Sequence, residues 1–283
     1  MTDTKKSGRL LVVGTPIGNL EDLSPRGRQA LAEASVLFCE DTRVTAKLAS
    51  RFHLTARRIS CPGPREEARV PELLQRLAAG ETVVLCSDAG MPTVSDPGAR
   101  FVAAAAEAGY PVLVIPGPSA PAAALAVSGL PAVPHVFLGF LPSRKGERER
   151  LLEGLRERDE TLVWFEVPHR LAGSLEDAAR VLGDRRACVA RELTKLHEET
   201  MRGTLPELAA AFRARGANRG EITVVVEGRR GPAESATQDE IDDRIREALA
   251  SGVSVKALAK EIARSSRRPA REVYARAIAL AKT

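Results

Sequence analysis

Short, uninterrupted runs of apolar residues alternate with longer amphipathic stretches along this chain, and this alternation is the strongest constraint on its fold. Unbroken apolar runs are typical of strands covered by helices on both faces. The predicted strands are Leu10–Val13, Val36–Cys39, Thr82–Cys86, Val112–Ile115, His135–Phe140, Thr161–Phe165, Ala187–Ala190 and Ile222–Val226. The predicted helices between them are Pro25–Ala34, Glu66–Ala79, Gly98–Ala108, Leu171–Leu182 and Leu205–Arg215. This order predicts α/β layers.

Two polar segments divide this pattern. Leu141–Arg150 is highly charged and could join two α/β lobes, and Gly228–Thr237 is a linker rich in glycine and charge. The 283 residues suggest about two domains. Beyond the second segment no strand is predicted, and the three expected helices are Gln238–Leu249, Ser254–Ala263 and Pro269–Ala281. We therefore expect an α/β body followed by a small helical region.

Composition excludes several functional classes. Only 4% of the residues are aromatic, which argues against a protein that binds nucleic acid mainly by base stacking. The four cysteines, Cys39, Cys61, Cys86 and Cys188, form no CxxC pair, so we expect buried thiols rather than a zinc site or disulfides. No apolar run reaches the ~18 residues of a membrane span, and the polar N-terminus lacks a secretory stretch. These features predict a cytoplasmic protein without a metal centre.

Three glycine-bearing loops each follow a predicted strand, and they are the first candidates for a binding site. They are Gly14–Asn19, Ser87–Gly98 and Pro116–Ala120. Ligands of open α/β sheets bind beyond the carboxyl ends of the strands, where glycine lets the backbone come close. Ordinary tight turns also use glycine, but three such loops in one lobe favour a small-molecule site. Neither the G-x-G-x-x-G spacing of dinucleotide-binding folds nor a P-loop occurs in the chain.

Three clusters of charged residues follow other strands. Glu40–Arg43, Phe165–Arg170 and Arg191–Lys195 combine carboxylates with basic groups. Arginine can hold phosphate oxygens, and a lysine whose pKa is depressed can accept a proton. The same residue types cap helices and form surface ion pairs, so their chemistry alone leaves both interpretations open.

The order of these motifs closely resembles one family. The motifs GTPIGNL, CEDTR, SDAGMPTVSDPG, PGPSA, GFLPSRKG, FEVPHR, ARELTK and GEITVVVEG are similar to those of the RsmI-type ribosomal RNA methyltransferases. The resemblance implies the tetrapyrrole methylase fold, in which two α/β lobes hold S-adenosyl-L-methionine in a cleft. It also implies a homodimer that methylates the ribose 2′-oxygen of a decoding-centre cytidine in 16S rRNA. The expected divisions are residues 1–118 and 119–230 for the two lobes and 231–283 for a small C-terminal helical domain.

The resemblance assigns the glycine loops to the cofactor, largely through backbone groups. The expected cofactor-binding residues are Pro16, Ser87, Asp88, Ala89, Gly90, Thr93, Val94, Ser119, Ala120, Phe165, Glu166, Ala190, Arg191, Gly220 and Glu221. The chain departs from the family's pattern at two places. Residues 60–67 lack a His-Asn pair that many relatives carry, so no role for that pair is carried over. Met91 stands where threonine is common; backbone contacts to the cofactor could survive this change, but a hydroxyl contact could not.

Methyl transfer to a ribose hydroxyl requires an oxygen held in line with the sulfonium and a group that takes the hydroxyl proton. The candidates for that base are Lys195 with a depressed pKa, Asp41 and Glu192, and the choice among them stays open. Arg43 and Arg191 are expected to position phosphates. A sulfonium is already an activated methyl donor, so the prediction includes no metal.

The last two predicted helices carry the excess positive charge of the chain. Residues 256–276 hold seven basic and two acidic residues, a net charge of +5 that equals the net charge of the whole chain. The apolar positions spaced to face inward are Val255, Leu258, Ile262, Val273, Ala277 and Ile278. The predicted RNA-binding residues on the outer surface are Lys256, Lys260, Arg264, Arg267, Arg268 and Arg271. An ordinary solvated helical face is the alternative interpretation; an RNA-phosphate patch is favoured.

Two other functions remain open on the sequence alone. The chain could be a small-molecule methylase acting on a tetrapyrrole, although such relatives usually begin with a GxGPG-type loop and rarely have a basic tail. It could also be a non-catalytic RNA-binding assembly factor that kept the fold. Cofactor binding would separate the second alternative from both enzymes.

Overall fold

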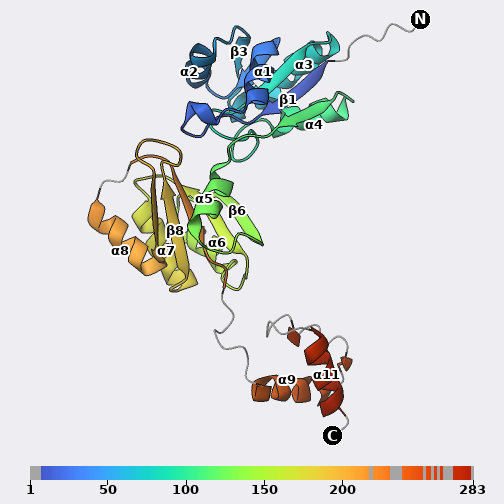
Figure 1. Cartoon of the computed structure of the whole chain (residues 1–283), viewed down its shortest axis with the longest axis vertical. Helices are drawn as coiled ribbons and strands as arrows, with labels where there is room; N and C mark the ends of the chain where they lie inside the picture. The colour runs from blue at the N-terminus through green and yellow to red at the C-terminus, as the bar shows by residue number, and fades with distance from the viewer. Residues whose placement is uncertain are drawn as a thin grey trace, which may run out of the picture. The chain divides into compact units, whose positions relative to one another are not determined.

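The computed structural model describes residues 8–216, 219–229, 238–250, 253–255, 258–259, 262–263 and 270–281. The chain divides into two compact units (Figure 1). The larger unit holds the described residues up to 156 together with 160–227, and the smaller unit holds 157–159 and the described residues from 228 onward. The larger unit contains two five-stranded sheets, which define a first and a second lobe.

The first lobe is built on a fully parallel sheet with the strand order β3-β2-β4-β1-β5. Its strands are β1 (Arg9–Val13), β2 (Val36–Cys39), β3 (Arg57–Ser60), β4 (Thr82–Cys86) and β5 (Val112–Ile115). Its helices are α1 (Pro25–Glu33), α2 (Thr42–Phe52), α3 (Glu66–Ala78) and α4 (Ala99–Glu107), with short 3₁₀ turns at Leu20–Asp22 and Gly63–Arg65. Leu11 and Val13 pack with α1 and α2, while Leu10 and Val12 pack with α3 and α4. Helices therefore cover both faces of the central strands, which explains their unbroken apolar runs. The edge strand β5 is also apolar, but its Leu113 and Val114 are exposed.

The second lobe has a mixed sheet with the strand order β6-β7-β10-β8-β9. The strands are β6 (His135–Phe140), β7 (Thr161–Glu166), β8 (Arg186–Arg191), β9 (Glu199–Thr204) and β10 (Ile222–Val226), of which only β6 and β7 pair in parallel. The helices are α5 (Ala120–Ser128), α6 (Lys145–Glu153), α7 (Leu171–Leu182) and α8 (Leu205–Arg215). Trp164 lies in the core beneath α6, α7 and α8, and its neighbour Val163 packs with α5 on the opposite face.

The eight predicted strands and five predicted helices of the α/β body are present, with ends that agree or differ by one residue. Two strands were not predicted, β3 and β9, and both lie at a sheet edge. An edge strand has a solvated side, so Arg57–Ser60 and Glu199–Thr204 carry polar residues that hide the strand pattern. Helices α2, α5 and α6 were also missed.

The interpretation of Leu141–Arg150 as a join between lobes was wrong. Most of this segment belongs to α6, inside the second lobe. The Arg148 side chain turns into that lobe, where its Nε donates to Asp177 Oδ2 at 2.9 Å. A charged sequence here reflects a buried ion pair and an exposed helical face, and the chain passes from the first sheet to α5 after Ile115. The division at residues 118 and 230 stays a prediction.

The smaller unit contains α9 (Gln238–Ala250) and α11 (Ala270–Leu280), and residues 255, 258–259 and 262–263 between them are also helical. A small core joins these parts, formed by Ile241, Ile245, Leu258, Ile262, Val273 and Ala277. Ile278 was predicted to face inward, but it is 36% exposed. Arg276 donates through Nε to Asp242 Oδ1 at 2.8 Å. Within the described residues, no helix is long and apolar enough to cross a membrane.

Candidate functional site

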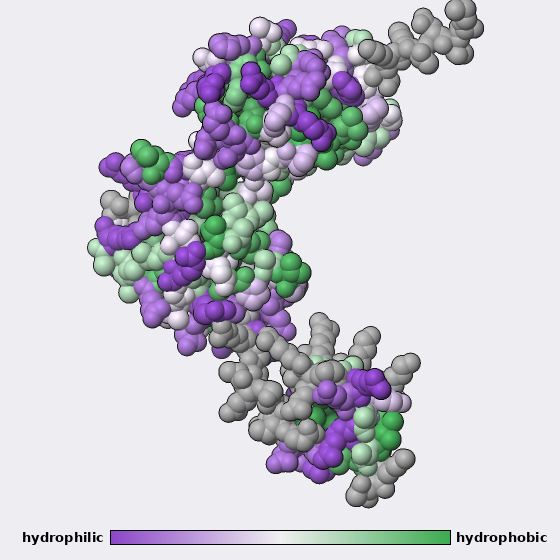
Figure 2. Space-filling view, in the orientation of Figure 1, coloured by the Kyte–Doolittle hydropathy of each residue, from purple (hydrophilic) through white to green (hydrophobic). Residues whose placement is uncertain are grey.

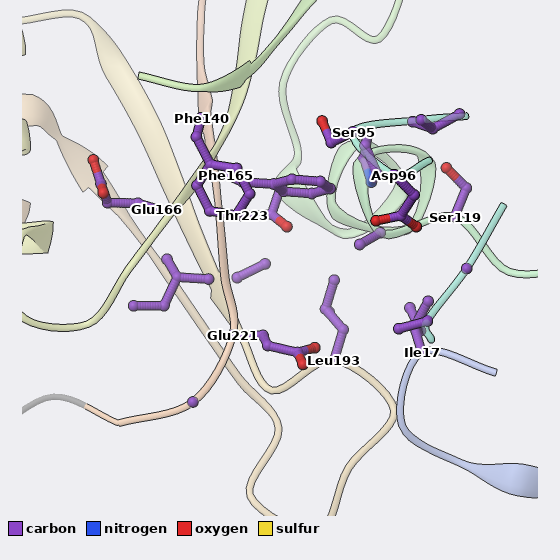
Figure 3. Close-up of a pocket in the computed structure, with 18 of the residues that line it drawn as sticks. Ile17, Ser95, Asp96, Ser119, Phe140, Phe165, Glu166, Leu193, Glu221 and Thr223 are labelled. Carbon is purple, nitrogen blue, oxygen red and sulfur yellow. The ribbon is translucent and has the colours of Figure 1, made fainter. Parts of the chain in front are cut away.

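A cavity of about 350 Å³ lies within the larger unit, between loops of its two lobes (Figure 3). The first lobe contributes the segments that follow β1, β4 and β5, as expected for the carboxyl ends of parallel strands. The second lobe contributes the ends of β6, β7 and β8 and the start of β10. The lining residues are Ile17, Ala89, Gly90, Met91, Val94, Ser95, Asp96, Ser119, Ala120, Pro121, Phe140, Phe165, Glu166, Val167, Pro168, Ala190, Leu193, Gly220, Glu221, Ile222 and Thr223. The volume is that of a small-molecule site.

The first-lobe loops are held together by close backbone approaches. Thr15 and Gly90 exchange two backbone hydrogen bonds, at 2.9 and 3.1 Å, and the buried Thr15 hydroxyl donates to the Ser87 carbonyl at 3.1 Å. A Cβ on Gly14 would come within 2.7 Å of the Gly117 backbone. Glycine is therefore required where the first and third loops meet, and Gly90, which these contacts hold in place, lines the cavity.

The loop after β1 also contacts the second lobe. The Asn19 amide donates to the Thr194 hydroxyl at 3.0 Å, and a Cβ on Gly18 would lie 2.5 Å from Lys195 Cγ. Ile17 packs with Leu193 and residues of α5 in a shared apolar cluster. These contacts bring the ends of β1 and β8 together, so one wall of the cavity is built from both lobes.

All the charged side chains that line the cavity are carboxylates. Asp96, Glu166 and Glu221 are lining residues, and no lysine, arginine or histidine lines this cavity within the described parts of the chain. Glu166 is paired with Arg170 at 3.1 Å. Burial raises the pKa of Asp96, and the nearby carboxylates of Asp88 and Glu221 raise it further against an opposing hydrogen bond with the Ser87 hydroxyl. The Ser87 hydroxyl also donates to the Gly90 carbonyl, with 3.0 Å between the two oxygens.

Glu192, Lys195 and Glu221 form a linked group at the edge of the cavity. Glu192 Oε1 accepts from Lys195 Nζ at 2.8 Å and from the Glu221 amide at 2.9 Å, while Lys195 Nζ lies 3.2 Å from Glu221 Oε2. Burial of the Lys195 ammonium works against its charge, but the two carboxylates outweigh burial and raise the pKa of Lys195. The expectation of a depressed lysine pKa was wrong, because the sequence does not reveal that two carboxylates meet this amine.

Asp41 and Arg43 lie outside the cavity lining and form a pair of their own. The Asp41 carboxylate caps α2 by accepting from the Arg43 amide at 2.8 Å, and it also accepts from Arg43 Nε at 3.0 Å. These hydrogen bonds lower the pKa of Asp41 to about 2. Hydrogen bonding to Lys195 likewise lowers the pKa of Glu192. Both carboxylates are therefore weak bases in this arrangement.

The predicted cofactor residues divide into two groups. Those that line the cavity are Ala89, Gly90, Val94, Ser119, Ala120, Phe165, Glu166, Ala190, Gly220 and Glu221. Those that do not are Pro16, Ser87, Asp88, Thr93 and Arg191. Ser87 is buried and supports the loop, and Asp88 accepts from the Asp41 amide at 3.0 Å. Arg191 is directed to Glu199, with Nε donating at 3.0 Å.

Several lining residues were not among the predicted site residues. One of them is Phe140, whose ring centroid stands 5.4 Å from that of the predicted residue Phe165, and another is Thr223, which lies beside both rings in Figure 3. Phe140 lies in the GFLP motif and Asp96 in the SDPG motif. Both motifs were recognised in the sequence, but the order of the motifs did not show that these two residues line the site. Thr223 carried none, because it lies inside a strand whose pattern is typical of a core.

Comparisons with known proteins agree with this architecture. Residues 9–209 match the family model of tetrapyrrole (corrin/porphyrin) methylases, which is the class that the fold and the interlobe cavity define. A solved structure of uroporphyrin-III C-methyltransferase from Thermus thermophilus, complexed with S-adenyl homocysteine, has a TM-score of 0.52 and 23% identity, covering 77% of this chain and 96% of that one.

Two relatives narrow the class. Ribosomal RNA small subunit methyltransferase I of Mycobacterium tuberculosis (strain CDC 1551 / Oshkosh) is 45% identical over 260 residues, 91% of this chain and 90% of that protein. The protein of the same name from Synechocystis sp. is 39% identical over 269 residues, 94% and 96% of the two chains. The chain therefore belongs to the family of ribosomal RNA small subunit methyltransferase I.

Proposed function

We propose that this protein transfers a methyl group from S-adenosyl-L-methionine to the ribose 2′-oxygen of a decoding-centre cytidine in 16S rRNA. The observation that carries the proposal is the interlobe cavity with its exclusively acidic charged lining, in a chain whose named relatives match it over more than nine-tenths of its length. We further propose that it acts in the cytoplasm as a homodimer, as the motif resemblance implies.

The donor set of the cavity fits S-adenosylmethionine. This cofactor carries a sulfonium, an ammonium and a carboxylate, so its net charge is a single positive one, which suits Asp96 and Glu221. Ile17, Leu193 and Phe165 supply apolar surface for the adenine ring, and backbone groups at Ala89 and Gly90 are available for hydrogen bonds. When bound, the cofactor supplies an activated methyl group on sulfur, which leaves as a thioether when the oxygen–carbon bond forms.

The residues of this chain would then act mainly by positioning. Holding the ribose oxygen in line with the methyl carbon accounts for roughly 7–11 kcal/mol of a barrier in well-oriented reactions. Lys195 is protonated, so in our proposal it is not the base. It supplies a positive charge near the substrate and positions Glu221 through their ion pair. The hydroxyl proton then passes to a carboxylate or to solvent. Glu192 and Asp41 remain candidates for the carboxylate that accepts it, although their lowered pKa values make them weak bases. Arg43 is the proposed phosphate contact.

The basic C-terminal residues are proposed to bind RNA phosphates. Arg271 is exposed on α11. The other predicted contacts, Lys256, Lys260, Arg264, Arg267 and Arg268, lie outside the described residues. Arg276, part of the same positive excess, is already neutralised by Asp242. Such a patch would raise the affinity for RNA without reading its sequence.

Methyl transfer to three kinds of substrate tests the function. The wild-type protein is incubated with methyl-labelled S-adenosylmethionine and small ribosomal subunits, naked 16S rRNA or a tetrapyrrole, and the product is mapped. Label at a single 2′-O-methylcytidine of the rRNA supports the proposal. Label only on the tetrapyrrole would favour the small-molecule alternative, and cofactor binding without transfer to any substrate would contradict the proposed activity.

A further inference from the structure

We propose that Asp96 makes the cavity selective for the charged methyl donor over its demethylated product. This inference rests on the proposed function, because it names the part of the site that tells S-adenosylmethionine from S-adenosylhomocysteine. The two molecules share an adenosine, an ammonium and a carboxylate. They differ in one methyl group and in the positive charge on sulfur, which is lost when the methyl group leaves.

Asp96 differs from the other two lining carboxylates in its surroundings. Glu166 is compensated by Arg170, and Glu221 shares the Lys195 ammonium with Glu192. In the described residues, no ion pair joins Asp96 to a basic side chain, and the charged groups that interact with it are the carboxylates of Glu40, Asp88 and Glu221. Figure 3 shows the Asp96 side chain at the cavity wall, on the side of the first lobe.

A half-buried carboxylate without a counter-ion is costly, since burial disfavours its charge. Asp96 is held in that position by its loop, where Ser95 has φ +67° and Gly98 has φ +127°. Ser87 supplies at most one neutral hydrogen bond, which leaves the negative charge uncompensated. A cation bound in the cavity would relieve this cost, and a neutral ligand of the same shape would not. The site therefore gains affinity for a ligand in proportion to the positive charge that it brings near Asp96.

The consequence concerns turnover as well as binding. Before transfer, the bound donor brings a positive charge near Asp96. After transfer, the sulfur is a neutral thioether, and the proton released from the ribose hydroxyl has passed to a carboxylate or to solvent, so the sulfonium charge is gone. The attraction to Asp96 then disappears, so the product leaves more easily than the donor does. This would limit inhibition of the enzyme by its own product.

Calorimetry with three ligands tests the role of Asp96. The ligands are S-adenosylmethionine, S-adenosylhomocysteine, and sinefungin, in which a carbon bearing an ammonium replaces the sulfonium. Changing Asp96→Asn keeps the shape and removes the charge, so the Kd of both cationic ligands should rise about tenfold or more while that of S-adenosylhomocysteine changes less than about threefold. The control is Asp184→Asn, an equal charge change at an exposed residue that does not line the cavity; it should leave all three values unchanged.

Equal losses for all three ligands would overturn the proposal, since Asp96 would then bind a part that they share. Wild-type protein that binds none of the ligands would instead contradict the proposed function. If Asp96→Asn does not fold, the salt dependence of ligand binding to the wild-type protein provides the test. Raising NaCl from about 50 to about 500 mM should weaken binding of the two cationic ligands more than binding of S-adenosylhomocysteine. An equal response to salt would overturn the proposal.

Discussion

The Lys195 ammonium lies 2.8 Å from the Glu192 carboxylate and 3.2 Å from that of Glu221, so a single cation holds two acidic side chains at the edge of the interlobe cavity. Glu192 adopts φ +51°, a conformation that costs a side-chain-bearing residue free energy. The hydrogen bonds from Lys195 and from the Glu221 amide compensate that cost. The arrangement of this group therefore depends on all three residues and on the adjacent Gly220.

The raised pKa of Lys195 predicts a flat pH response. A lysine whose pKa lies above its ordinary value of 10.5 stays protonated through neutral pH, and it loses its charge and its ion pairs only as the pH rises through the raised value. In a methyl-transfer assay between about pH 6.5 and 9.5, kcat should show no rising limb that depends on Lys195. Lys195→Arg, which keeps the charge, should retain more activity than Lys195→Ala. A rising limb below about pH 9 that disappears in Lys195→Arg would restore the lysine as the base.

Gly220→Ala should weaken cofactor binding as well as stability, because the new methyl group would collide with Glu192 in addition to straining the backbone. Gly220 has φ +90°, and a Cβ there would lie 2.4 Å from Glu192 Cδ. We expect a loss of stability of roughly 1–3 kcal/mol and at least about tenfold weaker binding of S-adenosylmethionine, because Glu192 and Glu221 must move. The matched control is Gly109→Ala, which has φ +78° and nothing within 4 Å of a Cβ. It should cost about 1 kcal/mol and leave cofactor binding unchanged, and equal binding losses in both variants would contradict the prediction.

Arg148→Ala should destabilise the second lobe. Arg148 and Asp177 are 9% and 7% exposed, so truncation leaves a buried carboxylate with less compensation. We expect a loss of about 2–3 kcal/mol, below the ~3–5 kcal/mol of a fully orphaned charge, because Arg180 still donates to Asp177 Oδ1 at 2.8 Å. Urea unfolding followed by fluorescence of the single tryptophan, Trp164, measures it. The exposed pair of Arg213 with Glu176 is the control, and Arg213→Ala should have little effect.

The basic C-terminal residues should affect RNA binding alone. Replacing Lys256, Lys260, Arg267 and Arg268 by glutamine should weaken RNA binding and reduce the dependence of log K on log salt, by up to about 0.7–0.9 for each phosphate that the variant no longer neutralises. Because every residue that lines the cavity belongs to the larger unit, the affinity for S-adenosylmethionine should not change. Filter binding across a salt series gives the slope, and calorimetry gives the cofactor affinity. An unchanged slope would contradict the phosphate patch.

The sequence by itself determined the α/β layers, because buried strands and the helices that cover them leave apolar patterns of different period. Leu10–Val13 and Ile222–Val226 are almost entirely apolar, since both of their faces are covered. It also determined the family, because the motifs after the strands occur in a fixed order. Edge strands such as Arg57–Ser60 escaped detection, since half of their environment is water.

Only the tertiary structure decided how the charged groups of the site are compensated. A pKa depends on which groups lie within a few ångströms, and Glu221 comes from a different loop than Glu192 and Lys195. The sequence placed a lysine near the site, but the two carboxylates around it made it a stable cation instead of a base. The compensation of Asp96 was likewise decided by the tertiary structure. Among the described residues that surround Asp96 none is a basic partner, and a linear motif does not reveal this.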